Sequence, residues 1–310
     1  MRTGGLLALC FLWLLSPPTS AQTEQLERAR QLVAAGRTEE AIAIYESLLP
    51  AGPDNPALRI NLAVAHFKAG QYAQVIEHCR AALRRDSDLP TAWLFLGASH
   101  FRLGQPKEAV EPLRKTLAAQ PGDRNARLML AESLLQLEDF AGAAEHFEVV
   151  SSSLADTPRI WYGLERSYHS LATVGLERLE RDAPGSPYLA ALTGETYLER
   201  RQYGLAFRHL REAREALPTL PGLHAALAAL YRQTGHAEWA AIEEEKERTL
   251  AQPDCSVPRN PPCLFAAARY RELASAGDSP EAVYWKIRAL RILASRAYDK
   301  LAALPASSHL

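Results

Sequence analysis

The sequence lacks an excess of charge of either sign. Its 310 residues include 35 lysines and arginines and 36 aspartates and glutamates, which gives a formal net charge of -1. Nucleic-acid binding calls for a basic face, so this balance argues against a nucleic-acid partner. Acidic tails and low-complexity tracts are also absent. With 47% hydrophobic residues, the composition is that of an ordinary globular chain with enough apolar material for an extended core.

Motifs for catalysis and metal binding are missing as well. The sequence contains no Gly-X-Ser-X-Gly, no phosphate-cradling glycine-rich loop, no His-Glu-X-X-His and no strand pattern. His66 and His100 lie in a column otherwise filled by leucine and tyrosine, so packing explains them. The acidic run 243–245 is interpreted as a solvated helix face. We therefore expect no enzyme, no metal site and no cofactor.

Cysteine is scarce, with four residues in the chain. Cys10 lies in the apolar N-terminal segment, and Cys79 lies in a core column that predicts a buried free thiol. Cys255 and Cys263 flank a proline-rich loop and form the natural disulfide pair in an oxidising compartment. Closing that loop would stabilise the fold by about 2.5 kcal/mol on the chain-entropy model. A redox-active dithiol is the alternative, although the spacing is not Cys-X-X-Cys.

Long apolar runs are confined to the N-terminus. Arg2 precedes the run Leu6–Leu15, and Ser-Pro-Pro and small residues follow it up to Ala21. This order is typical of a secretory signal peptide, here residues 1–21, cut near Ala21. An uncleaved anchor is the alternative, but the run is far shorter than the roughly 20 residues that span a bilayer. We expect a periplasmic or secreted protein with no stable membrane span after cleavage.

A repeat of 34 residues dominates the rest of the chain. Its columns are Leu62, Leu96, Leu130 and Leu164; Ala63, Gly97 and Ala131; Ala41, Val75, Ala109 and Ala143; and Gly36, Gly70 and Gly104. A fixed period of this length predicts stacked supersecondary units, none of which can bury its apolar side alone.

The clearest unit spans residues 90–123. Trp93, Leu96 and His100 recur at helical spacing and share one face of a first helix. Gly104 ends that helix, and an apolar stripe that includes Leu113 marks a second one. The small residues of the repeat let the two helix axes approach to roughly 8–10 Å.

Seven residues of this unit resemble the tetratricopeptide repeat (TPR), a helix–turn–helix unit of the same length: Trp93, Leu96, Gly97, Gly104, Ala109, Leu113 and Pro121. The resemblance covers most of residues 22–254. It implies an all-α, right-handed superhelical solenoid of stacked antiparallel helix pairs, of the kind found in exported bacterial TPR proteins.

The expected organisation has three parts. The signal peptide is followed by a TPR-like solenoid and by a cysteine loop with a degenerate C-terminal helical repeat. Their bounds are 1–21, 22–254 and 255–310, and the solenoid units lie near 22–55, 56–89, 90–123, 124–157, 158–186, 187–220 and 221–254. The short segments 158–186 and 279–303 are each either one long helix or a tight hairpin, and the sequence does not decide between these.

The resemblance also implies a binding surface, because first helices in this family line a concave groove that holds a peptide. Carried over by position, the lining is Ile60, Asn61, Val64, Phe67, Lys68, Leu94, Phe95, Ala98, Phe101, Arg102, Tyr162, Arg166 and His169. Apolar grooves usually mark partner sites, so we expect a protein or peptide partner. The alternative is that neighbouring helices cover these side chains.

The C-terminal segment carries an apolar face of its own, made of Tyr284, Ile287, Leu290, Leu293 and Leu301. An open solenoid end normally has a polar cap, so this face suggests self-association or partner docking through residues 279–303. Folding back of the final helix is the alternative.

Three functions follow in order of preference. The first is a non-catalytic interaction scaffold that works outside the cytoplasm. The second is a structural subunit of an envelope complex, docked through its C-terminal helices. The third is a redox-active protein that uses Cys255 and Cys263.

Overall fold

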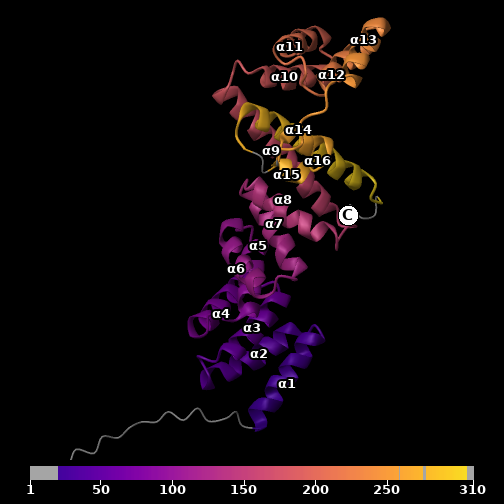
Figure 1. The fold of residues 1–310 in the computed structure, drawn as a ribbon. Helices are drawn as coiled ribbons and strands as arrows, with labels where there is room; N and C mark the ends of the chain where they lie inside the picture. The colour runs from indigo at the N-terminus through magenta and orange to yellow at the C-terminus, as the bar shows by residue number, and fades with distance from the viewer. Residues whose placement is uncertain (1–19, 258, 275–276, 306–310) are drawn as a thin grey trace, which may run out of the picture. The chain divides into compact units, whose positions relative to one another are not determined.

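The structure is a computed structural model that describes residues 20–257, 259–274 and 277–305. Nearly all of the predicted signal peptide lies outside these residues, and the first helix begins at Ser20. Over the described part, the regular elements are all helices that pack in sequential pairs, which confirms the all-α fold class (Figure 1). No helix in this part is long and apolar enough to cross a membrane. The described residues form two compact units, which divide between Met129 and Leu130.

The first unit consists of helix pairs joined by short turns. Its elements are α1 (Ser20–Ala34), α2 (Thr38–Leu48), η1 (Leu49–Ala51), α3 (Pro56–Lys68), α4 (Tyr72–Arg85), α5 (Pro90–Arg102), α6 (Pro106–Ala119) and the start of α7 (Arg124–Gln136). Proline opens α3, α5 and α6, where its missing N–H costs no helical hydrogen bond. The Asn55 side chain accepts hydrogen bonds from the backbone N–H groups of Ala57 and Leu58 and so caps α3.

Two uses of glycine explain the repeat columns. Gly36, Gly70 and Gly104 have φ of +77°, +75° and +67°, the left-handed turn between paired helices that favours glycine. Gly97 serves close packing instead, since a Cβ there would lie 2.8 Å from Cγ of Leu113 on the paired helix. The close approach expected from the small column is therefore real in this unit.

The second unit holds the remaining helices. They are the rest of α7, then α8 (Phe140–Ser151), α9 (Pro158–Asp182), α10 (Pro187–Glu199), α11 (Tyr203–Ala216), α12 (Leu223–Gln233), α13 (Ala237–Arg248), α14 (Pro261–Ala266), α15 (Tyr270–Ala274) and α16 (Pro280–Ala302). Pairs α10–α11 and α12–α13 repeat the packing of the first unit. As in α5, a helix glycine packs against leucine, since a Cβ on Gly194 would lie 2.7 Å from Leu210 Cγ.

Both segments that the sequence left undecided are single helices. Helix α9 runs for 25 residues and α16 for 23 residues without a turn. One residue of α9 helps to explain its continuity. Glu165 stands in the column of small residues, where a larger side chain disfavours the close approach of a paired helix. The helix continues to Asp182, with Ala183 as its C-cap just before Pro184.

Helix α16 packs along α9 in the antiparallel direction, and Figure 1 shows the two side by side. At one end, Arg178 donates to Asp278 at 2.8 Å. In the middle, a Cβ on Gly175 would lie 3.1 Å from Ile287 Cγ1. At the other end, Trp161 and Lys300 line the same pocket. A segment about 100 residues away thus supplies the antiparallel partner that α9 does not receive from the residues after it.

This pairing corrects the expectation of an open C-terminal face. Tyr284, Ile287 and Leu290 are at most 2% exposed, while Leu293 and Leu301 are half-buried. The final helix folds back, which was the alternative, so the apolar face that suggested self-association is covered within the chain. Burying several large apolar side chains at about 25 cal/mol per Å² makes this pairing a major source of stability for the unit.

A half-buried cation, Arg288, links α16 to its surroundings. The Arg288 guanidinium lies over the rings of Phe265, Tyr284 and Trp285 at 5.1–5.4 Å. It donates to the backbone oxygen of Pro221 at 3.1 Å and pairs with Glu195 at 3.6 Å. Burial acts to lower the pKa of Arg288, but Glu195 and Tyr284 outweigh it, so the pKa is raised and the side chain stays charged.

The cysteine loop closes as expected. Cys255 and Cys263 form a disulfide, with Cα atoms 5.7 Å apart, and the short helices α14 and α15 follow. Between these helices Ala268 has a φ of 56°, which is the left-handed conformation that Gly70 adopts at the matching position of the second repeat. Cys79 is a buried free thiol, also as expected, and burial raises its pKa to about 12.

Candidate functional site

The binding surface predicted in the first unit lies on α3 and α5, which contact each other. We call it the α3–α5 face. Its half-buried members are Ile60, Asn61, Val64, Phe67, Leu94, Phe95 and Phe101, its exposed members are Lys68 and Arg102, and Ala98 is buried. Neighbouring helices therefore cover these apolar side chains in part, and only Ala98 is removed from the surface.

Aromatic rings form the centre of the α3–α5 face. Phe67 meets Phe95 edge to face with centroids 5.1 Å apart, and it meets Tyr72 in the same way at 5.4 Å. Phe67 and Phe95 also pack against the core cluster that contains Cys79 and Leu96. These rings therefore pack against the core on one side and remain partly exposed.

The polar residues of the predicted binding surface differ in whether their side chains already form hydrogen bonds. The Lys68 ammonium donates to the backbone oxygen of Val33 at 3.2 Å, so it is partly occupied at the end of α1. Arg102 is exposed. Tyr162, Arg166 and His169 are exposed on α9 and belong to the second unit, where the Tyr162 side chain is 50% exposed.

Histidines of the first unit have structural partners. His66 Nδ1 lies 2.6 Å from Gln71 Oε1, and His100 Nδ1 lies 2.7 Å from Gln105 Oε1. Each pair joins the last turn of a first helix to the residue before the second helix, which fastens the hairpin turn. His66 also stacks on His78 with ring centroids 5.3 Å apart. The described residues contain no cluster of three or more His, Cys, Asp or Glu suited to a metal ion.

The interpretation of residues 243–245 as a solvated face was wrong for Glu243. Its side chain is buried, lies 2.5 Å from His224 Nδ1 and accepts from Lys246 at 2.8 Å. Burial acts to raise the pKa of Glu243, but the hydrogen bonds from Lys246 and His224 outweigh it and leave the pKa lowered. The pair ties α12 to α13. Sequence reasoning missed it because the run looks uniform, whereas helical spacing turns only one of its members inward.

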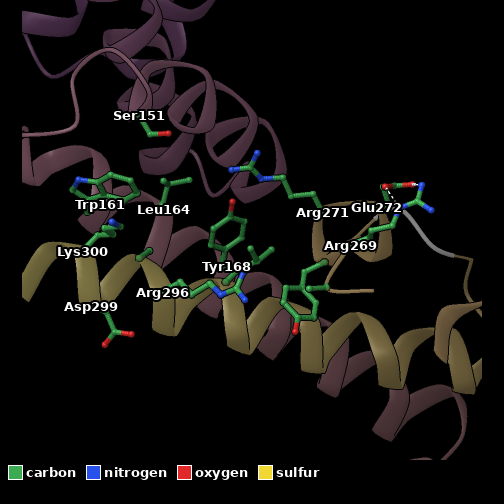
Figure 2. A pocket seen from close by; sticks show the side chains of 14 residues that line it. Ser151, Trp161, Leu164, Tyr168, Arg269, Arg271, Glu272, Arg296, Asp299 and Lys300 are labelled. Atoms are coloured by element: carbon green, nitrogen blue, oxygen red, sulfur yellow. Dashed lines mark hydrogen bonds and ion pairs between the residues drawn. The ribbon is translucent and has the colours of Figure 1, made fainter. Parts of the chain in front are cut away.

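The second unit contains a pocket that the sequence did not predict, with a volume of about 640 Å³. Helices α9, α15 and α16 form its walls, and Ser151 at the end of α8 lies at its edge (Figure 2). The lining is Ser151, Trp161, Leu164, Tyr168, Ala268, Arg269, Tyr270, Arg271, Glu272, Leu293, Arg296, Ala297, Asp299 and Lys300. We call it the α9–α16 pocket.

The walls of the α9–α16 pocket are aromatic and basic. Tyr168 donates to Glu148, and burial followed by this hydrogen bond raises the pKa of the Tyr168 hydroxyl. Arg271 pairs with the same carboxylate at 3.1 Å. The Arg296 guanidinium lies over the ring of Tyr270 at 4.9 Å. Trp161 donates its indole N–H to the backbone oxygen of Ala155 at 2.6 Å, which fixes the ring at the pocket wall.

Part of this pocket could have been found from the sequence. The segment from Phe265 to Tyr270 resembles the segment from Phe67 to Tyr72, which leads into the second helix of its repeat. A helix could therefore be predicted for the residues that follow Tyr270. The pairing of α16 with α9 was not readable, because it joins segments far apart in the chain. Without that pairing nothing brings Arg296 and Lys300 to the same place as Trp161.

A comparison with protein families identifies the repeats. The model described as "Tetratricopeptide repeat" matches residues 32–98, 66–123 and 100–166. Residues 32–166 are tetratricopeptide repeats. The predicted family resemblance is thereby confirmed for this segment, and the helix pairs of both units have the all-α form expected of a TPR chain.

Solved TPR structures give weaker matches. "Crystal structure of YrrB: a TPR protein with an unusual peptide-binding site" has 17% identity and a TM-score of 0.43, covering 69% of this chain and 94% of that chain. "First TPR of Spaghetti (RPAP3) bound to HSP90 peptide SRMEEVD" has 26% identity and a TM-score of 0.36, covering 37% and 92%. A MamA mutant structure has 17% identity and a TM-score of 0.42, covering 74% and 98%.

Proposed function

We propose that this chain is a non-catalytic scaffold that binds a segment of a partner protein on the α3–α5 face. The observation that carries the proposal is the set of half-buried aromatic and aliphatic side chains held on two adjacent first helices within the TPR segment. TPR proteins bind peptides or protein partners, and the YrrB and RPAP3 structures are named for peptide binding.

The mechanism is binding to a preformed surface. Phe67 and Phe95 are fixed by ring contacts and by the core beneath them, so little side-chain entropy is lost when a partner covers them. Leu94 and Phe101 extend the apolar area. Arg102, exposed at its edge, favours a partner segment with an acidic group at the matching position.

A charged variant tests this surface. Leu94→Glu with Phe101→Glu places two carboxylates on the α3–α5 face, whereas Gln74→Glu with Ala118→Glu places the same charge on exposed positions of α4 and α6. Both purified variants, checked for helicity, are used as bait in extracts of the source cells with quantitative mass spectrometry. We expect partners retained by wild type and by the α4/α6 control to be lost from the α3–α5 variant. Equal retention by all three proteins would refute the proposed face.

We also propose that the mature protein works in the periplasm or outside the cell. Support comes from the signal-peptide pattern of residues 1–21 and from the disulfide, since disulfides persist mainly in oxidising compartments. Mass spectrometry of the protein from its native source tests this. The expected N-terminus is Gln22, and recovery of residues 2–15 in the mature protein would contradict cleavage. A cut after Ala21 would remove only the first two residues of α1.

A further inference from the structure

The α9–α16 pocket lies between two long helices, α9 and α16, and the short helix α15. Helix α9 presents Trp161, Leu164 and Tyr168 to the pocket, at the repeat positions that Trp93, Leu96 and His100 occupy on α5. Here α16 covers one side, but α15 has only five residues. The space left between them is the pocket, with Tyr270 at the start of α15 forming part of its wall.

Two of its cations have no carboxylate partner among the ion pairs of the described residues. Arg269 is paired with Glu272, and Arg271 with Glu148 at 3.1 Å, so both are neutralised locally. Arg296 and Lys300 form no such pair. They lie four residues apart on α16, on one face of the helix, where like charges repel each other. An anion bound between them would remove that repulsion.

Both side chains line the pocket and remain exposed. In Figure 2, Arg296 extends toward Tyr168 and Lys300 lies beside Trp161, whereas the carboxylate of Asp299 points away from both rings. The Tyr270 ring supports the Arg296 guanidinium at 4.9 Å, which fixes its direction and leaves its N–H groups available. Planar guanidinium groups prefer carboxylates, and the aromatic walls suit an apolar or aromatic group next to that carboxylate.

We propose that the α9–α16 pocket binds a carboxylate that is attached to an aromatic or apolar group, with Arg296 and Lys300 as the charge-recognising residues. Such a ligand has two sources, an acidic segment of a partner protein or a small aromatic acid. The site lies in the second unit and involves no residue of the α3–α5 face, so the two proposals stand or fall separately.

Calorimetric titration of the full mature chain tests this site. The probes are acetyl-Glu-Phe-Glu-amide, its neutral counterpart acetyl-Gln-Phe-Gln-amide, and 3-phenylpropionate. We expect at least one carboxylate probe to bind, with an affinity that falls as the salt concentration rises. If the glutamate peptide binds, the glutamine peptide should bind at least tenfold more weakly. Arg296→Ala with Lys300→Ala should weaken binding at least tenfold, while Arg296→Lys with Lys300→Arg should retain most of it.

Arg181→Ala with Arg208→Ala is the matched control, because both side chains are exposed and lie outside the pocket. It should bind within twofold of wild type, and unchanged thermal unfolding of each variant shows that folding is intact. Binding of the peptide alone would point to a partner segment, and binding of 3-phenylpropionate to a small acid. No binding of either carboxylate, equal binding of the glutamate and glutamine peptides, or full binding by the Arg296/Lys300 alanine variant would overturn the proposal.

Discussion

At the scale of single residues, the turn between paired helices requires one residue with a left-handed backbone conformation, and residues of different types occupy that position. Gly104 meets it without strain at a φ of +67°. Glu138 and Arg201 adopt 61° and 58° at corresponding turns although they carry a Cβ. A left-handed conformation costs such residues roughly 1–2 kcal/mol, so these turns are points of local strain.

Replacement of Glu138 by glycine should therefore stabilise the protein. We expect a gain of about 1 kcal/mol in the free energy of unfolding, measured by urea denaturation, because the strain is removed at a modest entropic cost in the unfolded chain. Gly104→Ala is the mirror-image control and should lose a similar amount. Loss of stability in both variants would show that the Glu138 side chain contributes more than its backbone costs.

Close packing of α8 on α9 requires glycine at position 163. A Cβ there would lie 2.3 Å from Cζ of Phe147, a buried ring with no room to move. Gly163→Ala should destabilise by about 1–3 kcal/mol through overpacking, in spite of the higher helix propensity of alanine. Gly204→Ala, where nothing lies within 4 Å of the new Cβ, should be neutral or mildly stabilising. Thermal unfolding of the two variants gives the comparison, and similar midpoints would contradict the packing argument.

At the scale of elements, the helix pair α12–α13 depends on a buried carboxylate. Because the pKa of Glu243 is lowered in the folded state, its charged form adds stability above its ordinary pKa of about 4.5, and that stability is lost as pH falls through the folded value. Glu243→Gln should cost about 1–3 kcal/mol at neutral pH, because glutamine has no charge and offers one acceptor oxygen where His224 and Lys246 use two.

The pH dependence distinguishes this explanation from a packing defect. Urea denaturation of wild type and Glu243→Gln at several pH values should show the widest gap in unfolding free energy near pH 7. The gap should close as pH falls through the lowered pKa of folded Glu243 and its carboxylate becomes protonated. Glu245→Gln, at an exposed position of the same helix, should show little gap at any pH. A gap for Glu243→Gln that stays constant with pH would rule out the charge as its cause.

Elements with a strict local pattern were predictable from the sequence. The period placed the first and second helices of the early units, because a column such as Leu62 and Leu96 records contacts within one unit and its neighbour. The α3–α5 face followed from the family resemblance, but its partial burial depended on ring contacts such as Phe67 with Phe95. The continuity of α9 was not decided, since the absence of a turn signal is compatible with a helix and with a tight hairpin.

The long-range pairing of α9 with α16 could not be predicted from the sequence. Tyr284 and Ile287 form the same apolar stripe whether they meet a partner or fold back, so periodicity cannot choose between the two. Nothing in the local sequence indicated that Arg288 and Glu195 would form an ion pair. The α9–α16 pocket depends on this pairing, and its residues could not be assembled from any single repeat.

At the scale of the whole molecule, most helix contacts in the described part join neighbouring elements, and the contact of α9 with α16 is the most extensive exception. Repeat proteins transmit stability between nearest neighbours, so a core defect in one unit should leave a distant unit intact. The α9–α16 pairing breaks that rule, because it makes the stability of residues near 160–180 depend on residues near 280–300. The C-terminal helix is thus an integral part of the second unit.

Hydrogen exchange with mass spectrometry on the full chain tests whether α9 and α16 stabilise each other. In wild type, backbone amides of α9 and α16 should be protected from exchange to a similar degree. Ile287→Glu places a charge in the buried contact between these helices and should speed exchange in both. Helices α3–α6 should keep their wild-type exchange rates. Val174→Glu, at an exposed position of α9, is the control and should change neither helix. Rapid exchange of α16 in wild type, or an effect of Ile287→Glu confined to α16, would contradict the account.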